Sequence, residues 1–204
     1  MYIPAAYEEN DPAILHALMR QFPFATLITT AGGVPIATHL PFLLDAAGET
    51  GVLRAHLARA NPQWRQFSEG SEALVIFQGP HAYVSPAWYE SRPNVPTWNY
   101  AAVHAYGVPR LLGDAETFAL LRDSAAEYEP APETLDMPDG FVRRMQRGVV
   151  GFKIPILRLE GKRKMSQNKA EPDRAGVVAA LRRSGRPGDT EVADEMAKIL
   201  KSGG

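Results

Sequence analysis

The stretch from Phe24 to Leu57, FATLITTAGGVPIATHLPFLLDAAGETGVLRAHL, predicts an antiparallel sheet. Phe24 to Thr30 and Val34 to Leu44 are rich in β-branched and apolar residues, and Ala31-Gly32-Gly33 between them is typical of a hairpin turn. The turn AAGETG, residues 46–51, leads into a third strand from Gly51 to Leu57. Three consecutive strands with short turns indicate an antiparallel meander.

Helical and extended patterns lie on both sides of this meander. Segments with a capping residue or one apolar face predict helices over residues 12–22, 61–70, 114–128, 141–147, 173–185 and 189–200. Further extended segments are expected at residues 73–78, 99–107, 110–112 and 149–159. Many short strands with inserted helices favour a mainly β fold with α additions, an antiparallel barrel, over a parallel sheet.

The stretch from Ala73 to Gly107 is dense in aromatic residues and prolines. It reads ALVIFQGPHAYVSPAWYESRPNVPTWNYAAVHAYG and holds two of the three Trp and four of the seven Tyr. Its four prolines stiffen the backbone, so we expect an apolar strand followed by a rigid loop that could form a wall for a flat ligand. Trp88 and Tyr89 could equally belong to the core or to a dimer interface.

Composition limits the classes of function. The 204 residues are 45% hydrophobic and 22% charged, as expected for a globular chain with its own core. The absence of Cys excludes disulfides, thiolate metal sites and a Cys nucleophile. The N-terminus lacks the pattern of a signal peptide, and no apolar run approaches the roughly 20 residues of a membrane span, so we expect a cytoplasmic protein with no membrane partner.

Charge is distributed unevenly along the chain. Residues 1–140 carry 7 Lys and Arg against 16 Asp and Glu, whereas residues 141–204 carry 15 against 7. The basic region could neutralise the acidic part within or between subunits, or it could bind a phosphate-bearing ligand or nucleic acid.

Four polar residues on or after neighbouring predicted strands form a candidate anion site: His39, His56, Arg59 and Asn61. Each histidine could instead be a core residue bonded to a carbonyl group, and Asn61 could be a helix cap, a ligand contact or both. A metal site is not predicted, because no pair has helical i, i+4 spacing or a nearby carboxylate.

Several enzyme signatures are missing. No GxGxxG or GxxxxGK[ST] motif follows a strand, which excludes the usual Rossmann and P-loop phosphate sites. Ser85 and Ser91 lie near His81 in sequence, but there is no GxSxG motif to support a serine hydrolase. Glu90 is the one carboxylate in the aromatic loop, so paired acid and base groups are also missing there.

A basic segment, LEGKRKMSQN, runs from Leu159 to Asn168. Strand alternation would direct Lys162 and Lys164 to one face and Arg163 to the other. The segment could be a solvated hairpin edge protected by its lysines, or a contact for phosphate or nucleic acid.

These motifs occur together in a known family. In order, MYIP, ATHLPF, HLARANPQW, ALVIFQGPHAYVSPAWY, VPTWNYAAVHAYG and LEGKRKMSQN resemble the PaiB-type FMN-binding negative transcriptional regulators over nearly the whole chain. The resemblance implies an antiparallel FMN-binding split β-barrel related to pyridoxamine-phosphate oxidases and flavin reductases. It further implies a homodimer with FMN bound in clefts at the subunit interface.

The resemblance also places candidate flavin contacts and domain limits. For the phosphate we expect Arg59 and His56, with Lys164 from the late segment. The ring and ribityl contacts expected are Asn61, Gln63, Gln78, Trp98, Asn99, Ser166 and Gln167. We expect residues 1–168 to form the FMN-binding domain and residues 169–204 a C-terminal helical extension of it. Arg163 departs from the family, which would have an aromatic residue, typically Trp, at this position.

Three functions are compatible with these features. The first is an FMN-binding protein acting in transcriptional regulation or as a flavin-linked redox sensor. The second is an FMN-dependent oxidoreductase acting on reduced nicotinamide or a small organic substrate, because a flavin supplies its own redox chemistry. The third is a repressor that binds DNA directly through the basic region, for which no independent DNA-binding motif is present.

Overall fold

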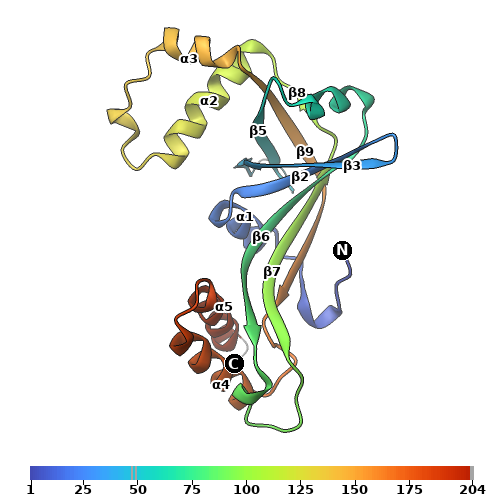
Figure 1. The fold of residues 1–204 in the computed structure, drawn as a ribbon, viewed down its shortest axis with the longest axis vertical. Helices are drawn as coiled ribbons and strands as arrows, with labels where there is room; N and C mark the ends of the chain where they lie inside the picture. Colours follow the sequence, from blue (N-terminus) through green and yellow to red (C-terminus); the bar gives the residue numbers. More distant parts are fainter. Residues whose placement is uncertain (47, 49, 203–204) are drawn as a thin grey trace. The chain divides into compact units, whose positions relative to one another are not determined.

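The computed structural model describes residues 1–46, 48 and 50–202, and the chain forms two compact units (Figure 1). The first unit comprises Met1–Leu15, Gln78–Val103 and Glu160–Gly204, and the second comprises His16–Phe77 and His104–Leu159. Strands β6, β7 and β9 contribute residues to both units. The predicted division into residues 1–168 and 169–204 stays a prediction.

Nine strands are described. They are β1 (Glu8–Glu9), β2 (Phe24–Ala31), β3 (Val34–Pro41), β4 (Leu43–Asp45), β5 (Val52–Ala58), β6 (Ala73–Val84), β7 (Thr97–Gly107), β8 (Arg110–Leu111) and β9 (Val149–Lys164). The helices are η1 (Ala5–Tyr7), α1 (Pro12–Gln21), η2 (Pro62–Glu69), η3 (Pro86–Trp88), α2 (Asp114–Tyr128), η4 (Pro132–Thr134), α3 (Asp139–Gln146), α4 (Glu171–Ser184) and α5 (Asp189–Ser202).

The strands form one mostly antiparallel sheet in the order β3-β2-β6-β7-β9-β5-β4, with β1 and β8 pairing to β9. β2 and β3 are a hairpin in which Phe24 faces Pro41 and Ala31 faces Val34. The predicted mainly β fold with antiparallel strands and added helices is confirmed.

The predicted second strand is interrupted in the structure. Pro41 ends β3 and has no N–H to donate, and the backbone N–H of Phe42 instead donates to the carbonyl of Pro23 at 2.9 Å. The chain then pairs again as β4. The turn predicted at residues 46–51 includes residues 47 and 49, which lie outside the described residues.

An aromatic cluster fills the core of the second unit. The ring of Phe152 lies 4.9 Å from Phe67 and 6.1 Å from Phe42 between centroids, and Phe42 lies 5.9 Å from Phe77. Tilted and edge-on rings at these separations are favourable arrangements for aromatic side chains in a core. Phe42 from the predicted meander therefore belongs to this core, but the meander itself is wrong, because β3 pairs with β2 whereas the third strand, β5, pairs with β4 and β9.

The aromatic loop is shorter than predicted. β6 continues to Val84 and β7 begins at Thr97, so the irregular segment is residues 85–96, including the short helix η3. Alternation of buried and exposed positions extends through residues 80–84, which carries the strand past Gly79. Ser85 caps η3 by accepting a hydrogen bond from the N–H of Ala87 at 3.2 Å.

The last strand is longer than predicted. β9 extends through Lys164, and β1 pairs with it so that Glu8 faces Lys162 and Glu9 faces Gly161. This pairing joins residues more than 150 positions apart, which local periodicity does not show. Gly161 permits the close approach of β1, since an added Cβ would lie 2.6 Å from the Glu9 carbonyl oxygen.

Candidate functional site

In the second unit, the two predicted histidines differ in environment. His39 is exposed on β3, and its ring stacks beside Phe24 at 6.5 Å between centroids. His56 lies half-buried on β5, and this burial lowers its pKa below the ordinary value. An imidazole with a lowered pKa is neutral at pH 7, so His56 is available to a phosphate as a hydrogen-bonding group rather than as a cation.

Asn61 and Gln63 belong to a polar network around η2. Asn61 caps the helix by accepting from the N–H of Gln63 at 3.0 Å, and its amide donates to Thr38 Oγ1 at 3.0 Å. Gln63 is fully buried, donates to Thr29 Oγ1 at 3.0 Å and to the Ile36 carbonyl at 3.1 Å, and accepts from Thr38 Oγ1 at 2.5 Å. The structure thus uses both residues to join η2 to β2 and β3.

Arg59 lies at the end of β5 and is held by the backbone. Its Nε donates to the Arg147 carbonyl at 2.8 Å and its Nη2 to the Val149 carbonyl at 2.7 Å. β5 pairs with β9 at this point, with Ala58 opposite Val149, which brings the two segments together. The two carbonyls fix the orientation of the guanidinium without neutralising its charge.

A basic cleft of about 380 Å³ opens at this arginine, and we refer to it as the arginine cleft. Its lining residues are Arg59, Asp114, Arg143, Gln146 and Arg147. Gln146 donates to the Asp114 carbonyl at 2.7 Å, which ties the end of α3 to the start of α2. Three guanidinium groups and one carboxylate give the cleft an excess of positive charge.

The donor set of the arginine cleft fits a phosphate group. Guanidinium groups are planar and permanently charged, and they bind phosphate oxygens through pairs of N–H donors. The volume is within the range of about 300–1,000 Å³ typical of ligand sites. The cleft has no aromatic lining residue, so any stacking partner for an isoalloxazine ring has to come from other residues.

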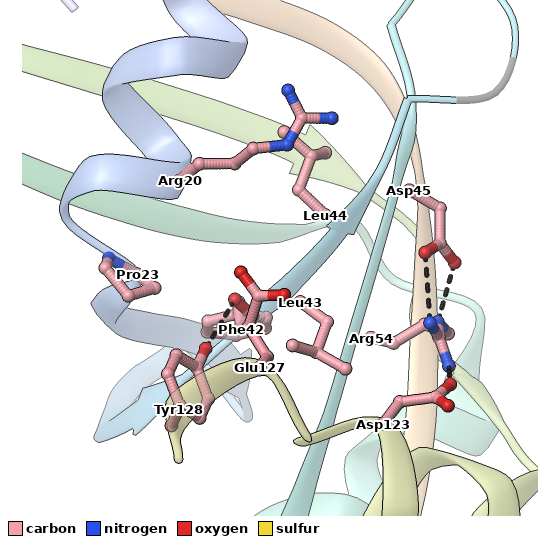
Figure 2. Close-up of a pocket in the computed structure, with 10 residues that line it drawn as sticks. All are labelled: Arg20, Pro23, Phe42, Leu43, Leu44, Asp45, Arg54, Asp123, Glu127 and Tyr128. Atoms are coloured by element: carbon pink, nitrogen blue, oxygen red, sulfur yellow. Dashed lines mark hydrogen bonds and ion pairs between the residues drawn. The ribbon is translucent and has the colours of Figure 1, made fainter. Parts of the chain in front are cut away.

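A second pocket in this unit is not suited to a flavin. It has a volume of about 140 Å³ and is lined by the ends of α1 and α2 and by β4 and β5 (Figure 2). Arg54 occupies one side, donating to Asp45 at 2.6 and 3.0 Å and to Asp123 at 2.7 Å. Tyr128 closes another side by donating to the Phe42 carbonyl at 3.1 Å. The space left is too small for a three-ring cofactor.

In the first unit, Asn99 and Ser166 form a buried pair. The Asn99 amide donates to Ser166 Oγ at 3.0 Å and lies 3.3 Å from the sulfur of Met196, and both Asn99 and Ser166 are almost fully buried. Ser166 has φ = 60°, in the left-handed region where non-glycine residues are uncommon. The pair fixes the turn after β9 against β7 and α5.

Lys164 and Gln167 also make contacts within this unit. Lys164 Nζ donates to Thr97 Oγ1 and, at 2.7 Å, to the Trp98 carbonyl. Burial, and to a lesser degree repulsion from Lys162, lower the pKa of Lys164. Gln167 accepts from the Met165 N–H at 2.6 Å and donates to the Arg163 carbonyl, closing the turn after the strand.

Trp98 and Gln78 lie in an exposed aromatic group on β6 and β7. The Trp98 ring is 54% exposed and lies 6.4 Å from His81 and 6.0 Å from Tyr83 between centroids. Gln78 is exposed, with its amide 3.3 Å from the His81 ring nitrogen. The expectation that this aromatic stretch forms a wall for a flat ligand stays a prediction.

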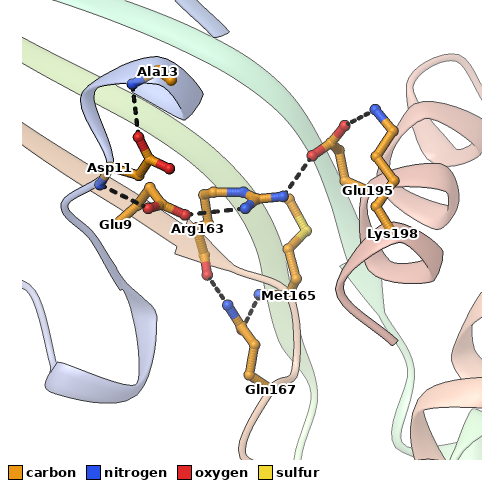
Figure 3. Close-up of polar contacts among 8 residues, drawn as sticks. All are labelled: Glu9, Asp11, Ala13, Arg163, Met165, Gln167, Glu195 and Lys198. Atoms are coloured by element: carbon orange, nitrogen blue, oxygen red, sulfur yellow. Dashed lines mark hydrogen bonds and ion pairs between the residues drawn. The ribbon is translucent and has the colours of Figure 1, made fainter. Parts of the chain in front are cut away.

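Arg163 belongs to an ion-pair group with Glu9, Glu195 and Lys198 (Figure 3). Its guanidinium donates to Glu9 at 3.1 Å and to Glu195 of α5 at 2.9 Å, and these three side chains are largely buried. Burial alone would raise the pKa of Glu195, but hydrogen bonds from Lys198 and Arg163 outweigh it and lower the pKa. Arg163 therefore joins β1, β9 and α5.

The environment of Lys162 contradicts one of the two alternatives for the basic segment, the solvated hairpin edge protected by lysines. The side chain is 8% exposed, donates to the Tyr2 carbonyl at 3.1 Å, and lies 5.2 Å from the Tyr100 ring centroid. A solvated lysine edge is therefore wrong for this residue, because β1 and the first residues of the chain cover it.

Sequence reasoning missed Arg143 and Arg147. They are four residues apart at the end of α3, a spacing that places two helical side chains on one side. The sequence RRMQR shows that spacing, but nothing in it shows that Arg59, more than 80 residues earlier, reaches the same cleft.

Two further findings concern metal binding and membrane-spanning helices. Within the described ranges, no group of three or more His, Asp or Glu side chains is placed to hold a metal ion. None of the helices in the part of the chain that the structure describes has both the length and the apolar character needed to cross a membrane.

Comparison with solved structures defines the class as the split-barrel fold of flavin-binding proteins. The FAD and heme binding protein from Mycobacterium smegmatis has a TM-score of 0.65 at 17% identity, covering 85% of this chain and 80% of that chain. The flavocytochrome Anf3 from Azotobacter vinelandii has a TM-score of 0.63 at 16% identity, covering 81% and 71%. At such identities the likeness concerns the fold.

Sequence comparison then gives the family. A family model described as "Putative FMN-binding domain" matches residues 1–158. The protease synthase and sporulation protein PAI 2 of Bacillus subtilis is 36% identical over 205 residues, covering 98% of this chain and 99% of that protein. An uncharacterized protein of Emericella nidulans is 34% identical over 250 residues, covering 100% and 98%. The chain belongs to the PaiB-type FMN-binding family, which confirms the resemblance, the split-barrel fold and FMN as the cofactor.

Proposed function

We propose that this protein is a cytoplasmic, homodimeric FMN-binding regulator in which the flavin is a bound ligand or redox sensor. The observation that carries the proposal is the similarity over almost its whole length to PAI 2, whose name records a role in protease synthesis and sporulation. FMN supplies redox chemistry when bound. The protein's own groups orient the cofactor and respond to its state.

The predicted flavin contacts fall into two groups, one in each unit. His39, His56, Arg59, Asn61 and Gln63 belong to the second unit. We propose that Arg59 and His56 contact the phosphate and that His39 and the η2 cap contact the ribityl chain. Gln63 would act by holding the cap in place, since its amide is fully buried.

The other group belongs to the first unit: Gln78, Trp98, Asn99, Lys164, Ser166 and Gln167. We propose that Trp98 and Gln78, which are exposed, contact the isoalloxazine ring. Asn99 and Ser166 are buried against each other and would position the Lys164 to Gln167 turn.

Contacts of the basic residues in the stretch 163–186 support neutralisation of this stretch within the chain over direct DNA binding. Arg163 pairs with two carboxylates, Arg182 donates to Asp194 at 2.9 Å, and Arg186 donates to Asp189 at 3.2 Å. Arginines engaged in this way are less available to phosphates of DNA.

Flavin titration of the purified protein tests the proposal. We expect FMN to bind one per chain, with the absorbance band near ~450 nm shifted on binding, and the dimer to persist on sedimentation. Failure to bind FMN would overturn the proposal. Steady oxidation of reduced nicotinamide by the FMN-loaded protein would favour an oxidoreductase instead. DNA binding that weakens steeply with salt would favour the direct repressor.

A further inference from the structure

We infer that Arg143 and Arg147 of α3, together with Arg59, form the binding site for the phosphate group of FMN in the arginine cleft. This inference rests on the proposed function, because it assigns the phosphate end of the flavin that the family implies. Neither arginine of α3 was among the predicted site residues.

Orientation is the first argument. Two backbone carbonyls hold the Nε and Nη2 groups of Arg59, at 2.8 and 2.7 Å; one belongs to Arg147, directly after α3, and the other to Val149, the first residue of β9. These two bonds use Nε and Nη2 and not Nη1, and Arg59 lines the cleft. The backbone that orients Arg59 is also the backbone that carries Arg147, so the two guanidinium groups are placed by one structural element.

Charge is the second argument. In the part of the chain that the structure describes, no carboxylate pairs with Arg59, Arg143 or Arg147. Asp114 is the single acidic residue lining the cleft. Elsewhere in this unit, by contrast, Arg54 is paired with two carboxylates. The net charge of the cleft complements a phosphate monoester, which carries close to two negative charges at neutral pH.

Preorganisation is the third argument. Arg143 lies with its guanidinium carbon 4.7 Å from the ring centroid of Phe118 on α2, which restricts its rotamers. Gln146 anchors the same helix end to Asp114. A side chain already restricted in this way loses less conformational entropy when it binds an anion.

The remaining phosphate candidates are less suitable as cations. Burial lowers the pKa of His56, and Lys164 already donates to Thr97 and to the Trp98 carbonyl. The arginine cleft therefore supplies the charge that the phosphate needs.

The test compares FMN with riboflavin, which lacks the phosphate. Binding of both flavins is measured by fluorescence titration of the full-length protein and of the double variant Arg143→Gln/Arg147→Gln. Arg144→Gln is the matched control, because Arg144 is a neighbouring exposed arginine that does not line the cleft and packs instead on Phe141 at 5.3 Å. Thermal unfolding of each variant without flavin confirms equal folding.

We expect each lost guanidinium to weaken FMN binding about tenfold, so the double variant should lose about 100-fold in FMN affinity while riboflavin affinity is unchanged. Arg144→Gln should retain the wild-type ratio of the two affinities. A double variant that keeps the wild-type preference for FMN over riboflavin would overturn the inference and leave the proposed function intact.

If the proposed function is wrong, the result differs, because neither FMN nor riboflavin binds the wild-type protein. In that event the midpoint of thermal unfolding is measured with added inorganic phosphate. A phosphate-dependent rise in the wild type that is lost in the double variant supports an anion site in the arginine cleft for another phosphate monoester. Equal phosphate-dependent changes of the unfolding midpoint in the two proteins would also contradict an anion site in the arginine cleft.

Discussion

Replacement of Gln63 by Met tests whether this residue is structural, as its burial indicates, rather than a direct flavin contact. Met has a similar length and volume but cannot replace the amide hydrogen bonds. The variant loses the bonds to Thr29 Oγ1, Thr38 Oγ1 and the Ile36 carbonyl, at 3.0, 2.5 and 3.1 Å. Each buried hydrogen bond contributes about 1 kcal/mol net, so we expect a loss of about 3 kcal/mol in the free energy of unfolding.

For a chain of this length, 1 kcal/mol corresponds to a change of about 2–4 °C in Tm, so the apo variant should unfold roughly 6–12 °C below the wild type. Circular dichroism at matched protein concentrations measures this shift. Gln78→Met is the control, because Gln78 is exposed and its replacement should change stability by less than about 0.5 kcal/mol. A Gln63→Met protein with wild-type Tm and lost FMN affinity would refute the structural role.

Further predictions concern the first unit. Arg163→Met leaves the buried Glu9 without its cation and removes one of the two cations of Glu195, whose other partner is Lys198, so urea unfolding should show a loss of about 3 kcal/mol, and adding Glu195→Gln should recover part of it. A wild-type urea midpoint for Arg163→Met would contradict this. Because the pKa of Glu195 is lowered on folding, its ionised carboxylate stabilises the folded protein above the unfolded pKa of about 4.3. This stabilisation is lost as the pH falls through the lower folded pKa. Below about pH 4.5, stability should therefore fall more steeply in the wild type than in Glu195→Gln; equal slopes would argue against it. Gly161→Ala should cost about 1–3 kcal/mol, whereas Gly140→Ala, with open space around its Cβ, should be nearly neutral in the same urea assay.

Local patterns predicted much of the fold. Alternation between Phe24 and Leu57 indicated the first strands, and the cap at Asn61 is confirmed, because its side chain accepts a hydrogen bond from the N–H of Gln63 at 3.0 Å. These features depend on residues close in sequence. Family motifs supplied the split barrel and FMN, which periodicity alone could not.

Contacts between residues distant in sequence account for the structural environments that the sequence did not predict. Lys162 looked like a solvated lysine because nothing local shows that β1 pairs beside it. The bonds of Gln63 to Thr29 and Thr38 were not predicted either, because these partners lie on strands much earlier in the chain, and a flavin contact of Gln63 stays a prediction. Arg143 was missed for the same reason, because it lines the arginine cleft together with Arg59, which follows β5 much earlier in the chain.

The interleaving of the two units along the chain affects biosynthesis. The first unit combines residues from both ends with a central stretch, so it lacks α4, α5 and the end of β9 until the last fifth of the chain has left the ribosome. Pairing of such distant segments is slow and leaves apolar strands exposed meanwhile. Expression of residues 1–158 alone, the span of the family match, would cut β9 before Arg163 and leave β1 without its partner strand. Such a fragment should aggregate, and co-expressed chaperones should raise the soluble yield of the full chain.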